Sequence, residues 1–329
     1  MKKIEVKVSS TFELEKSVCN HGFFMMAPNR WIPSTKTLTR PLRLLPRHHH
    51  HSSNVTISIS QPCSTSLSII LLDDLIITPS QQQEIVDQVK RMLRLSKEAE
   101  KQVKEFHRLH EEAAKRGFGR LFRNPSLFED VVKSLLLCGC RFQRSLEMAE
   151  GLCKLQKWLG KKCKWGNFPS AQELANLESE ELLRNKCKLG YRAGPIMRLA
   201  KAVTNGEIKL LDYELNNNEF GDEESMFQKL KTIKGFGDFV TCNVLMCMGF
   251  YDRIPIDSET IRHIKQIHQR KECQKKNVKA MVKEIYDKYA PFQTLAYWLE
   301  LVEYYENNMG KLSLLERCHY KSVTGSIIT

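Results

Sequence analysis

The stretch from residue 230 to residue 264 constrains the fold of this chain more than any other part of the sequence. A helix-like segment is followed there by two glycines two positions apart, Gly235 and Gly237. Glycines permit the backbone angles that a tight turn needs. A second, apolar helix begins at once around Asp238, because the residues after it are almost all apolar. The sequence therefore predicts two helices joined by a hairpin at residues 233–238.

A hairpin of this kind predicts contact with phosphate. The first N–H groups of a helix have no partner inside the helix, and the helix dipole is positive at the same end. Such a site can hold a DNA phosphate without reading any base. Taken alone, however, this turn fits ordinary helix-hairpin geometry equally well. The candidate DNA-binding residues in the hairpin are Gly235, Phe236, Gly237 and Asp238.

Asp257 is the candidate catalytic residue, and it stands just before another predicted helix. Aspartate is a good N-cap, so capping alone explains its position, and the spacing by itself favours that simpler role. A fixed carboxylate can also stabilise positive charge on a sugar and align an attacking water. The two roles are compatible, because a capping carboxylate can still face a substrate.

The charge balance points to a polyanionic partner. The chain has 51 Lys+Arg against 38 Asp+Glu, a formal net charge of +13. Such a surface attracts nucleic acid or anionic lipid. No stretch reaches the roughly 20 apolar residues of a membrane helix, so we expect no membrane span. Arg262 and Lys265 open a basic run and are candidate DNA contacts, although charge runs are more often solvated faces.

The organisation along the chain predicts a mainly α (α+β) fold. Residues 55–60 alternate β-branched and polar side chains, and residues 67–72 form a second apolar run, so both are expected to be strands. Helical periodicity dominates afterwards. We expect an antiparallel β region over residues 1–78, a helical domain over residues 79–315 and a C-terminal tail over residues 316–329.

Three helix starts are predicted from capping residues. Ser80 with Gln83 and Ser170 with Glu173 have the spacing of capping boxes. Asn124-Pro125 combines a good N-cap with a proline at the first helical position.

The sequence resembles the helix-hairpin-helix (HhH-GPD) superfamily of base-excision DNA glycosylases. The signature of that superfamily is a Gly-x-Gly hairpin, an apolar helix and then Pro-x-Asp. The segment 189–193 is similar to the Gly-x-Arg-Ala helix start of the family, and the segment 12–42 resembles the N-terminal strands of its 3-methyladenine DNA glycosylase II and 8-oxoguanine glycosylase branches. The resemblance is that of a plant-like member and covers nearly the whole chain. The residues that match the signature are Gly235, Gly237, Pro255 and Asp257.

The resemblance implies two helical lobes with DNA between them and Asp257 as the catalytic carboxylate. Family members that also cut the DNA backbone carry a lysine two residues after the second hairpin glycine. Phe239 stands there, and a phenyl ring cannot form a Schiff base, so a monofunctional glycosylase that leaves an abasic site is expected. Two alternatives stay open: a damaged-DNA-binding protein in which Asp257 only caps its helix, and a bifunctional glycosylase/lyase with another lysine, such as Lys234.

Enzymes that flip a base need a side chain to fill or distort the gap. The resemblance places this wedge in the turn after the helix at residues 124–138, where Gly139 replaces the polar amide common in the family. A surface turn with Phe142 packed inward is an equal alternative. The wedge candidates are Cys140, Arg141, Phe142 and Gln143, and the candidate walls of a base pocket, also plausible as core residues, are Trp31, Tyr191 and Trp298.

The remaining expectations concern partners and cofactors. We expect a monomer that acts in the nucleus on double-stranded DNA containing a damaged base, with alkylated purines the first candidates because a cationic base is a good leaving group. No metal or cofactor is expected. Only Cys273 and Cys318 follow Asp257, whereas an iron–sulfur cluster needs four thiolates. The run His48–His51 is expected to be a solvated loop.

Overall fold

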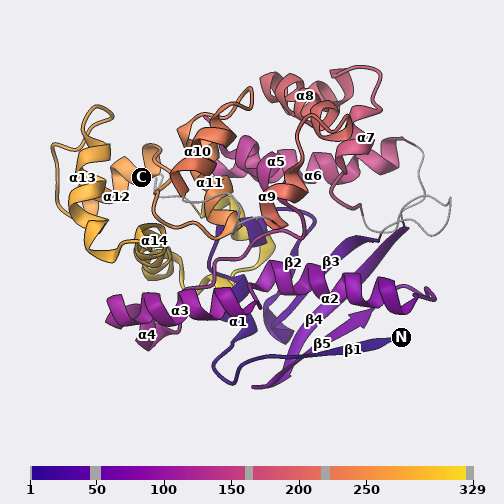
Figure 1. Cartoon of the computed structure of the whole chain (residues 1–329), viewed down its shortest axis with the longest axis horizontal. Helices are drawn as coiled ribbons and strands as arrows, with labels where there is room; N and C mark the ends of the chain where they lie inside the picture. The colour runs from indigo at the N-terminus through magenta and orange to yellow at the C-terminus, as the bar shows by residue number, and fades with distance from the viewer. Residues whose placement is uncertain (1, 45–52, 160–165, 216–222, 324–329) are drawn as a thin grey trace.

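The computed structural model of the chain describes residues 2–44, 53–159, 166–215 and 223–323. A five-stranded sheet lies on one side of a mostly helical body (Figure 1). The predicted mainly α fold with a small antiparallel sheet is thereby confirmed. The run His48–His51 and the last six residues of the expected C-terminal tail lie outside the described residues.

The sheet is antiparallel throughout, with the strand order β1-β5-β4-β3-β2. In the central strand, Val55, Ile57 and Ile59 are fully buried, as the alternation of the sequence predicts. Ile59 pairs with Leu38 on one side and with Ile69 on the other, so apolar side chains of three strands meet. The strands are β1 (Lys3–Lys7), β2 (Arg30–Ile32), β3 (Thr37–Leu44), β4 (Ser53–Cys63) and β5 (Ser66–Leu71).

Strand β3 overlaps the segment 12–42 that resembles the N-terminal strands of the family, but the pattern of its own residues does not predict a strand, because it contains a proline and two arginines. Pro41 pairs with Thr56 in the middle of the sheet. Arg40 is only 1% exposed, and its guanidinium binds Glu129 at 2.9 Å. The strand therefore contains one partner of a buried ion pair that its local sequence pattern does not predict.

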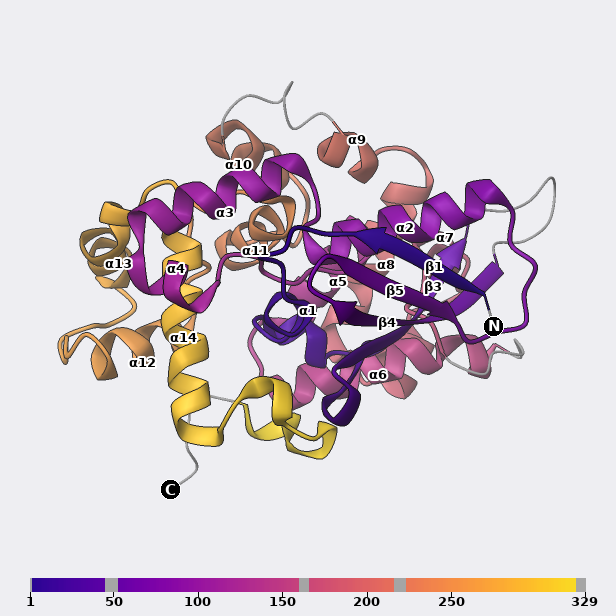
Figure 2. The ribbon, with the colours of Figure 1, turned by 90° about the horizontal axis from the view of Figure 1, so that it is seen from below.

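The helical body packs over the sheet. Seen from below in Figure 2, β1, β5 and β4 lie in front, and α5, α6 and α8 lie behind them. None of the helices within the described ranges is long and apolar enough to cross a bilayer. The longer helices are α2 (Pro79–Leu93), α3 (Lys97–Leu109), α5 (Leu127–Leu137), α6 (Phe142–Trp158), α8 (Ala193–Thr204), α10 (Glu223–Lys231), α11 (Asp238–Met248), α12 (Ser258–Gln266), α13 (Val278–Tyr286) and α14 (Gln293–Met309).

The remaining helical segments are short. They connect the longer helices or join the N-terminal strands to the body. These segments are α1 (Leu14–Val18), η1 (Gly22–Met25), η2 (Pro33–Thr35), α4 (Glu111–Arg116), α7 (Ala171–Ala175), η3 (Leu182–Lys186), η4 (Gly190–Arg192), α9 (Leu210–Leu215), η5 (Asp287–Tyr289), η6 (Leu312–Leu314) and η7 (Arg317–Ser322).

Two of the three predicted helix starts are shifted. Helix α2 is capped by Thr78 with Gln81 and not by Ser80. Helix α5 is capped by Ser126, two residues after the predicted Asn124. The third prediction, the capping box of Ser170 and Glu173 before α7, is confirmed.

Asn124 does not cap α5 because it is part of a buried polar network. Its backbone and side-chain amides both donate to Asp130 at 2.8 Å, and its carbonyl oxygen accepts from Lys133 at 2.6 Å. Lys133 has no exposed surface and also binds Glu129 at 2.8 Å, which in turn binds Arg40. This network joins β3 to α5, so the sheet and the helical body share charged as well as apolar contacts.

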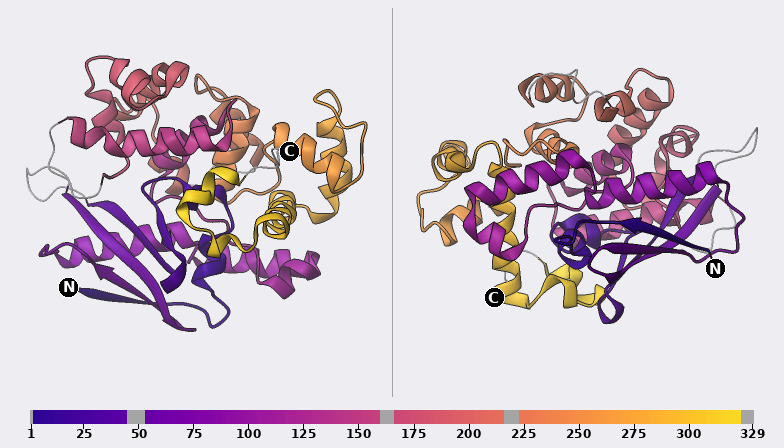
Figure 3. Two further views of the ribbon diagram at one scale, coloured as in Figure 1. Left: turned by 180° about the vertical axis from the view of Figure 1, so that it is seen from behind. Right: turned by 60° about the horizontal axis from the view of Figure 1, so that its bottom comes forward.

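The segment that follows β1 and α1 meets the C-terminal segment of the described chain. The indole of Trp31 donates to the carbonyl of Ser313 at 2.8 Å, and the ring of Phe24 packs edge-on against that of Tyr320, with centroids 5.6 Å apart. Figure 3 shows the yellow C-terminal segment lying against the indigo N-terminal segment. One continuous cluster of buried apolar residues reaches from Ile4 to Val323.

Candidate active site

The hairpin between α10 and α11 has the geometry of an anion site. Gly235 has a φ angle of +101°, which favours glycine, and Gly237 is the N-cap of α11. Gly237 has no side chain that could cap the first N–H groups, and a Cβ placed on it would meet nothing within 4 Å. The start of α11 therefore opens to solvent, where a phosphate oxygen can reach its amides.

Phe236 shapes the turn from inside. Its side chain is 5% exposed, and its backbone N–H donates to the carbonyl of Ile233 at 3.0 Å. Of the four candidate DNA-binding residues in the hairpin, Phe236 thus differs from the expectation, because its amide is already used. Gly235, Gly237 and Asp238 lie on the exposed side.

Asp238 would repel a phosphate at this helix start if its charge were not balanced. Its two carboxylate oxygens bind Lys231 at 2.7 Å and Lys279 at 2.8 Å. Hydrogen bonds from Lys231 and then Lys279 lower the pKa of Asp238 to about 2. The charges of these three side chains sum to +1, so the neighbourhood of the hairpin is cationic.

Asp257 caps α12, as the sequence predicts. Its Oδ1 accepts the backbone N–H of Thr260 at 3.0 Å, while the Thr260 hydroxyl accepts the N–H of Asp257 at 3.2 Å. The same hydroxyl lies 3.0 Å from the hydroxyl of Tyr297 on α14. Two helices therefore fix the position of this carboxylate.

Asp257 is exposed, and its side chain lines a cavity. Burial raises the pKa of Asp257 above its ordinary value, and the Glu259 charge adds to the rise, while hydrogen bonds from Thr260 lower it. Where surrounding protein lowers the dielectric constant beside a carboxylate, the carboxylate acts more strongly on a charge that develops there.

A cavity of about 710 Å³ lies beside Asp257. Its walls come from distant parts of the chain: the N-terminal segment at residues 20–25, the turn between α5 and α6, the start of α11, the loop before α12, and one face of α14. This volume falls within the range of small-molecule sites.

Phe239 lines this cavity together with Asp257. It belongs to the first turn of α11, directly after the hairpin. The position two residues after Gly237 therefore faces the same space as the candidate catalytic carboxylate. A phenyl ring there contributes apolar surface and no nucleophile.

The turn between α5 and α6 lies on the cavity, and three of the four wedge candidates line it: Cys140, Arg141 and Phe142. Gln143 does not line the cavity, and its side-chain amide donates to Glu147 at 3.2 Å along α6. The turn depends on Gly139, which has a φ angle of +57°.

The three lining side chains of this turn differ in exposure. Arg141 is exposed, whereas Phe142 is half-buried and its ring packs against Gly22. Arg192 and Tyr191 both donate to the carbonyl of Cys138 and so hold the turn from behind. Arg141 is thus the candidate of this turn with the most freedom to reach outward.

Of the three aromatic residues considered as pocket walls, only Trp298 lines the cavity. Trp31 is buried in the core, and Tyr191 is 64% exposed outside the cavity. Sequence reasoning missed the lining rings of His21, Phe23, Tyr297 and Tyr305. The spacing of Trp298, Leu301, Val302 and Tyr305 on α14 was the available signal, because residues three, four and seven apart share one helix face.

His21 adds a neutral polar ring to this wall. It is 3% exposed, and burial lowers its pKa to about 3, so the imidazole is uncharged at neutral pH. Its ring packs edge-on against Trp298, with centroids 4.6 Å apart. The aromatic wall therefore carries no positive charge of its own.

The two candidate DNA contacts on α12 differ in their surroundings. Arg262 is bound to Glu259 and Gln266, and its guanidinium stacks over the Tyr304 ring at 4.0 Å. Its side chain is 12% exposed and already paired within the protein, so little of its charge is accessible to DNA. Lys265 is exposed.

No protein-family model matches this sequence, and no curated protein matches it. Solved structures do match the fold. A 3-methyladenine DNA glycosylase from Archaeoglobus fulgidus aligns with a TM-score of 0.63 and 18% identity, covering 94% of this chain and 100% of that one. A structure described as MBOgg1 in complex with a low-affinity DNA ligand gives a TM-score of 0.65 and 20% identity, covering 94% and 96%.

The 8-oxoguanine glycosylase/lyase of Clostridium acetobutylicum, in complex with double-stranded DNA containing cytosine opposite 8-oxoguanine, aligns with a TM-score of 0.61 and 15% identity. The alignment covers 93% of this chain and 99% of that chain. At such identities the likeness concerns the fold. This chain has the fold of these DNA glycosylases over nearly its whole length.

Proposed function

We propose that this protein is a DNA glycosylase of base-excision repair. It flips a damaged base out of double-stranded DNA and hydrolyses the bond between that base and deoxyribose. The observation that carries the proposal is the position of Asp257 on a 710 Å³ cavity, with the hairpin helix α11 and the turn between α5 and α6 on the same cavity. The fold shared with DNA glycosylases supports the same function.

The mechanism follows from the charges around the cavity. Breaking an N-glycosidic bond places positive charge on the sugar, and the fixed carboxylate of Asp257 stabilises that charge and aligns or deprotonates the attacking water. The open start of α11, at Gly235 and Gly237, holds a backbone phosphate next to the extruded nucleotide. Lys265 adds an exposed charge for a further phosphate.

The reaction stops at an abasic site in this proposal. Phe239 occupies the cavity position where the family resemblance implies a lysine in enzymes that also cut the backbone. The aromatic wall and the nearby carboxylates Asp257 and Glu259 suit a planar, cationic base, so alkylated purines are the first substrates to test. We propose that the enzyme acts as a monomer in the nucleus.

The test is base release from a panel of duplexes, each with a single lesion, by the wild type, Asp257→Asn and Asp287→Asn. Asp287 is exposed and lies outside the cavity lining, so its variant is the matched control. We expect wild type and control to release one class of base, and Asp257→Asn to be slower by about 10²–10⁴-fold while it still binds DNA. Equal release by Asp257→Asn would remove the catalytic role of this residue.

Strand cleavage without alkali, and trapping of a covalent DNA adduct by borohydride, would instead indicate a bifunctional glycosylase/lyase. Tight binding to damaged duplexes without release of any base would favour a damaged-DNA-binding protein in which Asp257 only caps α12. Neither outcome is expected from a cavity that combines Asp257 with Phe239.

A further inference from the structure

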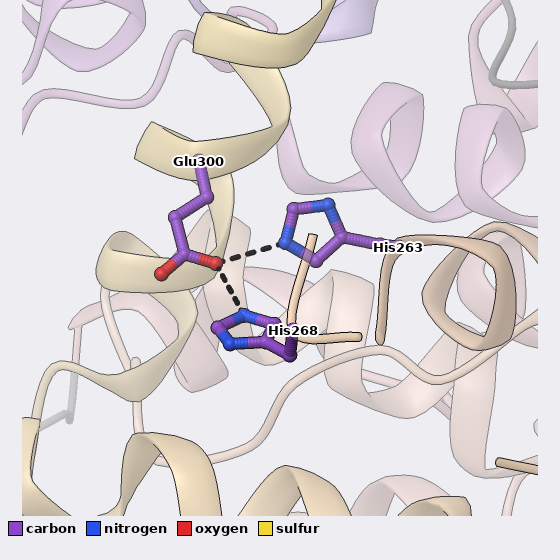
Figure 4. Close-up of side chains that lie close together, drawn as sticks. All are labelled: His263, His268 and Glu300. Carbon is purple, nitrogen blue, oxygen red and sulfur yellow. Dashed lines mark hydrogen bonds and ion pairs between the residues drawn. The ribbon is translucent and has the colours of Figure 1, made fainter. Parts of the chain in front are cut away.

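A second cluster of chemically active side chains lies outside the cavity. His263 projects from α12, His268 lies in the turn after that helix, and Glu300 projects from α14 (Figure 4). The Nε2 atoms of the two histidines lie 2.8 Å and 2.9 Å from the same carboxylate oxygen, Oε2 of Glu300. None of the three residues lines the cavity beside Asp257.

One oxygen atom is the centre of this cluster. Oε2 of Glu300 also accepts the hydroxyl of Tyr286 at 2.5 Å, so three donors crowd on one oxygen. Burial raises the pKa of Glu300, but hydrogen bonds from His263, His268 and Tyr286 outweigh it and hold the pKa at about 2. Glu300 is therefore ionised at neutral pH, and its charge faces two imidazoles that can each present either a proton or a lone pair.

The donor set is the one that zinc prefers. Zinc is bound by imidazole nitrogen and carboxylate oxygen at about 2.0–2.2 Å, usually with tetrahedral geometry. Two ligands of such an ion lie about 3.4 Å apart, so the observed pairs need to open by only about half an ångström. All three ligand atoms already lie within 4.8 Å of one another.

The chain geometry brings the ligands together and leaves them accessible. Gln269, directly after His268, has a φ angle of +57°, a left-handed conformation that is uncommon for a residue other than glycine. The side chains of His268 and Glu300 are 22% and 23% exposed, which gives an ion a path from solvent. Water can complete the coordination.

We propose that His263, His268 and Glu300 bind one zinc ion. The ion joins α12, the helix that Asp257 caps, to α14. Zinc on Nε2 of His263 puts the proton of that ring on Nδ1, which is buried and has no partner among the described residues. A hydrogen-bond partner on the second ring nitrogen of a ligating histidine strengthens a zinc site. Because Nδ1 of His263 has no such partner among the described residues, we expect only moderate affinity, in the micromolar range.

The experiment uses full-length protein that has been stripped with a chelator. Zinc is titrated in competition with a chromogenic indicator, and cobalt(II) is titrated while its visible absorption is recorded. The same titrations are made on His268→Gln and Glu300→Gln. Glu303→Gln is the matched control, because Glu303 lies on α14 one turn further on and pairs with Arg116 instead.

We expect the wild type and Glu303→Gln to bind one equivalent of zinc at the cluster. In His268→Gln and Glu300→Gln, the affinity for this equivalent should be at least about tenfold weaker. X-ray absorption of this ion should show nitrogen and oxygen ligands only. The comparison removes the background from the His48–His51 run and from the 11 cysteines, which all four proteins share.

Equal binding by wild type and cluster variants would overturn the proposal, and so would a sulfur-only coordination shell. If Glu300→Gln fails to fold, His268→Gln and the wild-type stoichiometry still decide, since His268 lies in a half-exposed turn. Base release is not part of these readouts, so the zinc site and the glycosylase function are tested separately.

Discussion

Asp257 illustrates how one residue serves the fold and the site together. Its Oδ1 is occupied by the cap of α12, which fixes the carboxylate against Thr260 and, through it, against Tyr297. The same carboxylate keeps its open surface toward the cavity. The structure therefore allows Asp257 to cap α12 and to face a substrate in the cavity at the same time.

The raised pKa of Asp257 leads to a prediction about pH. In the proposed mechanism the carboxylate acts in its ionised form, and burial raises its pKa above the ordinary value of about 3.9. We expect the rate of base release under single-turnover conditions to fall on the acid side around a midpoint above that value. A midpoint at or below 3.9 would show that the surrounding protein does not raise the pKa of Asp257.

The raised pKa of Asp257 also affects the free energy of unfolding, and there it makes the ionised carboxylate unfavourable. A carboxyl group whose pKa is higher in the folded state contributes stability below its unfolded pKa and loses that contribution as the pH rises through the folded pKa. Asp257→Asn also keeps a good N-cap. The variant should therefore remain folded at neutral pH, so its loss of activity has a chemical cause.

Lys133 gives a second prediction at this scale. It is fully buried between Glu129 and Asn124, so Lys133→Met leaves Glu129 with one cation fewer. Breaking a buried charge network in this way typically costs about 3–5 kcal/mol. We expect urea unfolding to show that loss, whereas Lys154→Met, which removes the exposed partner of Glu150, should stay within about 0.5 kcal/mol of the wild type. Similar losses for both would show that the network adds nothing.

At the scale of elements, the two glycines of the hairpin before α11 have different roles. Gly235 provides the backbone angle of the turn, and Gly237 leaves space for a phosphate. Gly235 has a positive φ, so Gly235→Ala should destabilise the protein by about 1–3 kcal/mol. Gly237 has an ordinary φ of −79° and open space around it, so Gly237→Ala should leave stability nearly unchanged but weaken DNA binding, because its methyl group takes the place of the phosphate. Denaturant unfolding and equilibrium DNA binding measure the two effects, and a Gly237→Ala variant with unchanged DNA affinity would argue against the phosphate site.

The elements that the sequence predicts well are those with local signals. Helix α11 follows from an apolar run between two glycines, and β4 follows from strict alternation. Strand β3 could not be predicted in the same way. Its Arg40 and Pro41 are stabilised by contacts with α5, far along the chain, and such contacts leave no periodic pattern.

The candidate site follows the same division. Asp257, Phe239 and the α5–α6 turn were placed by motif spacing, and all lie on the cavity. His21 and the N-terminal wall were not, because nothing near residue 21 indicates that α14 packs against it. The cluster of His263, His268 and Glu300 was missed for a related reason, since the third ligand is 37 residues from the first.

At the scale of the whole molecule, the sheet and the helical body form one packing unit. Buried apolar contacts run from Ile4 to Val323, and Arg40 completes the buried network of α5. We expect a fragment of residues 79–329 to be unable to fold alone, because it would expose this core and leave Glu129 and Lys133 without Arg40. Near-ultraviolet circular dichroism and urea titration check this, and a cooperative unfolding transition of the fragment would contradict it.

The walls of the cavity come from the beginning, the middle and the end of the described chain, from Asn20 to Val323. This has a consequence for a chain emerging from the ribosome. The hairpin can form from local contacts, but the chamber beside Asp257 is completed only by residues between Tyr297 and Val323, which are translated 40 to 66 residues after Asp257. If the protein is the glycosylase that we propose, a chain that lacks its C-terminal segment would therefore have an incomplete chamber beside Asp257 and would release no base.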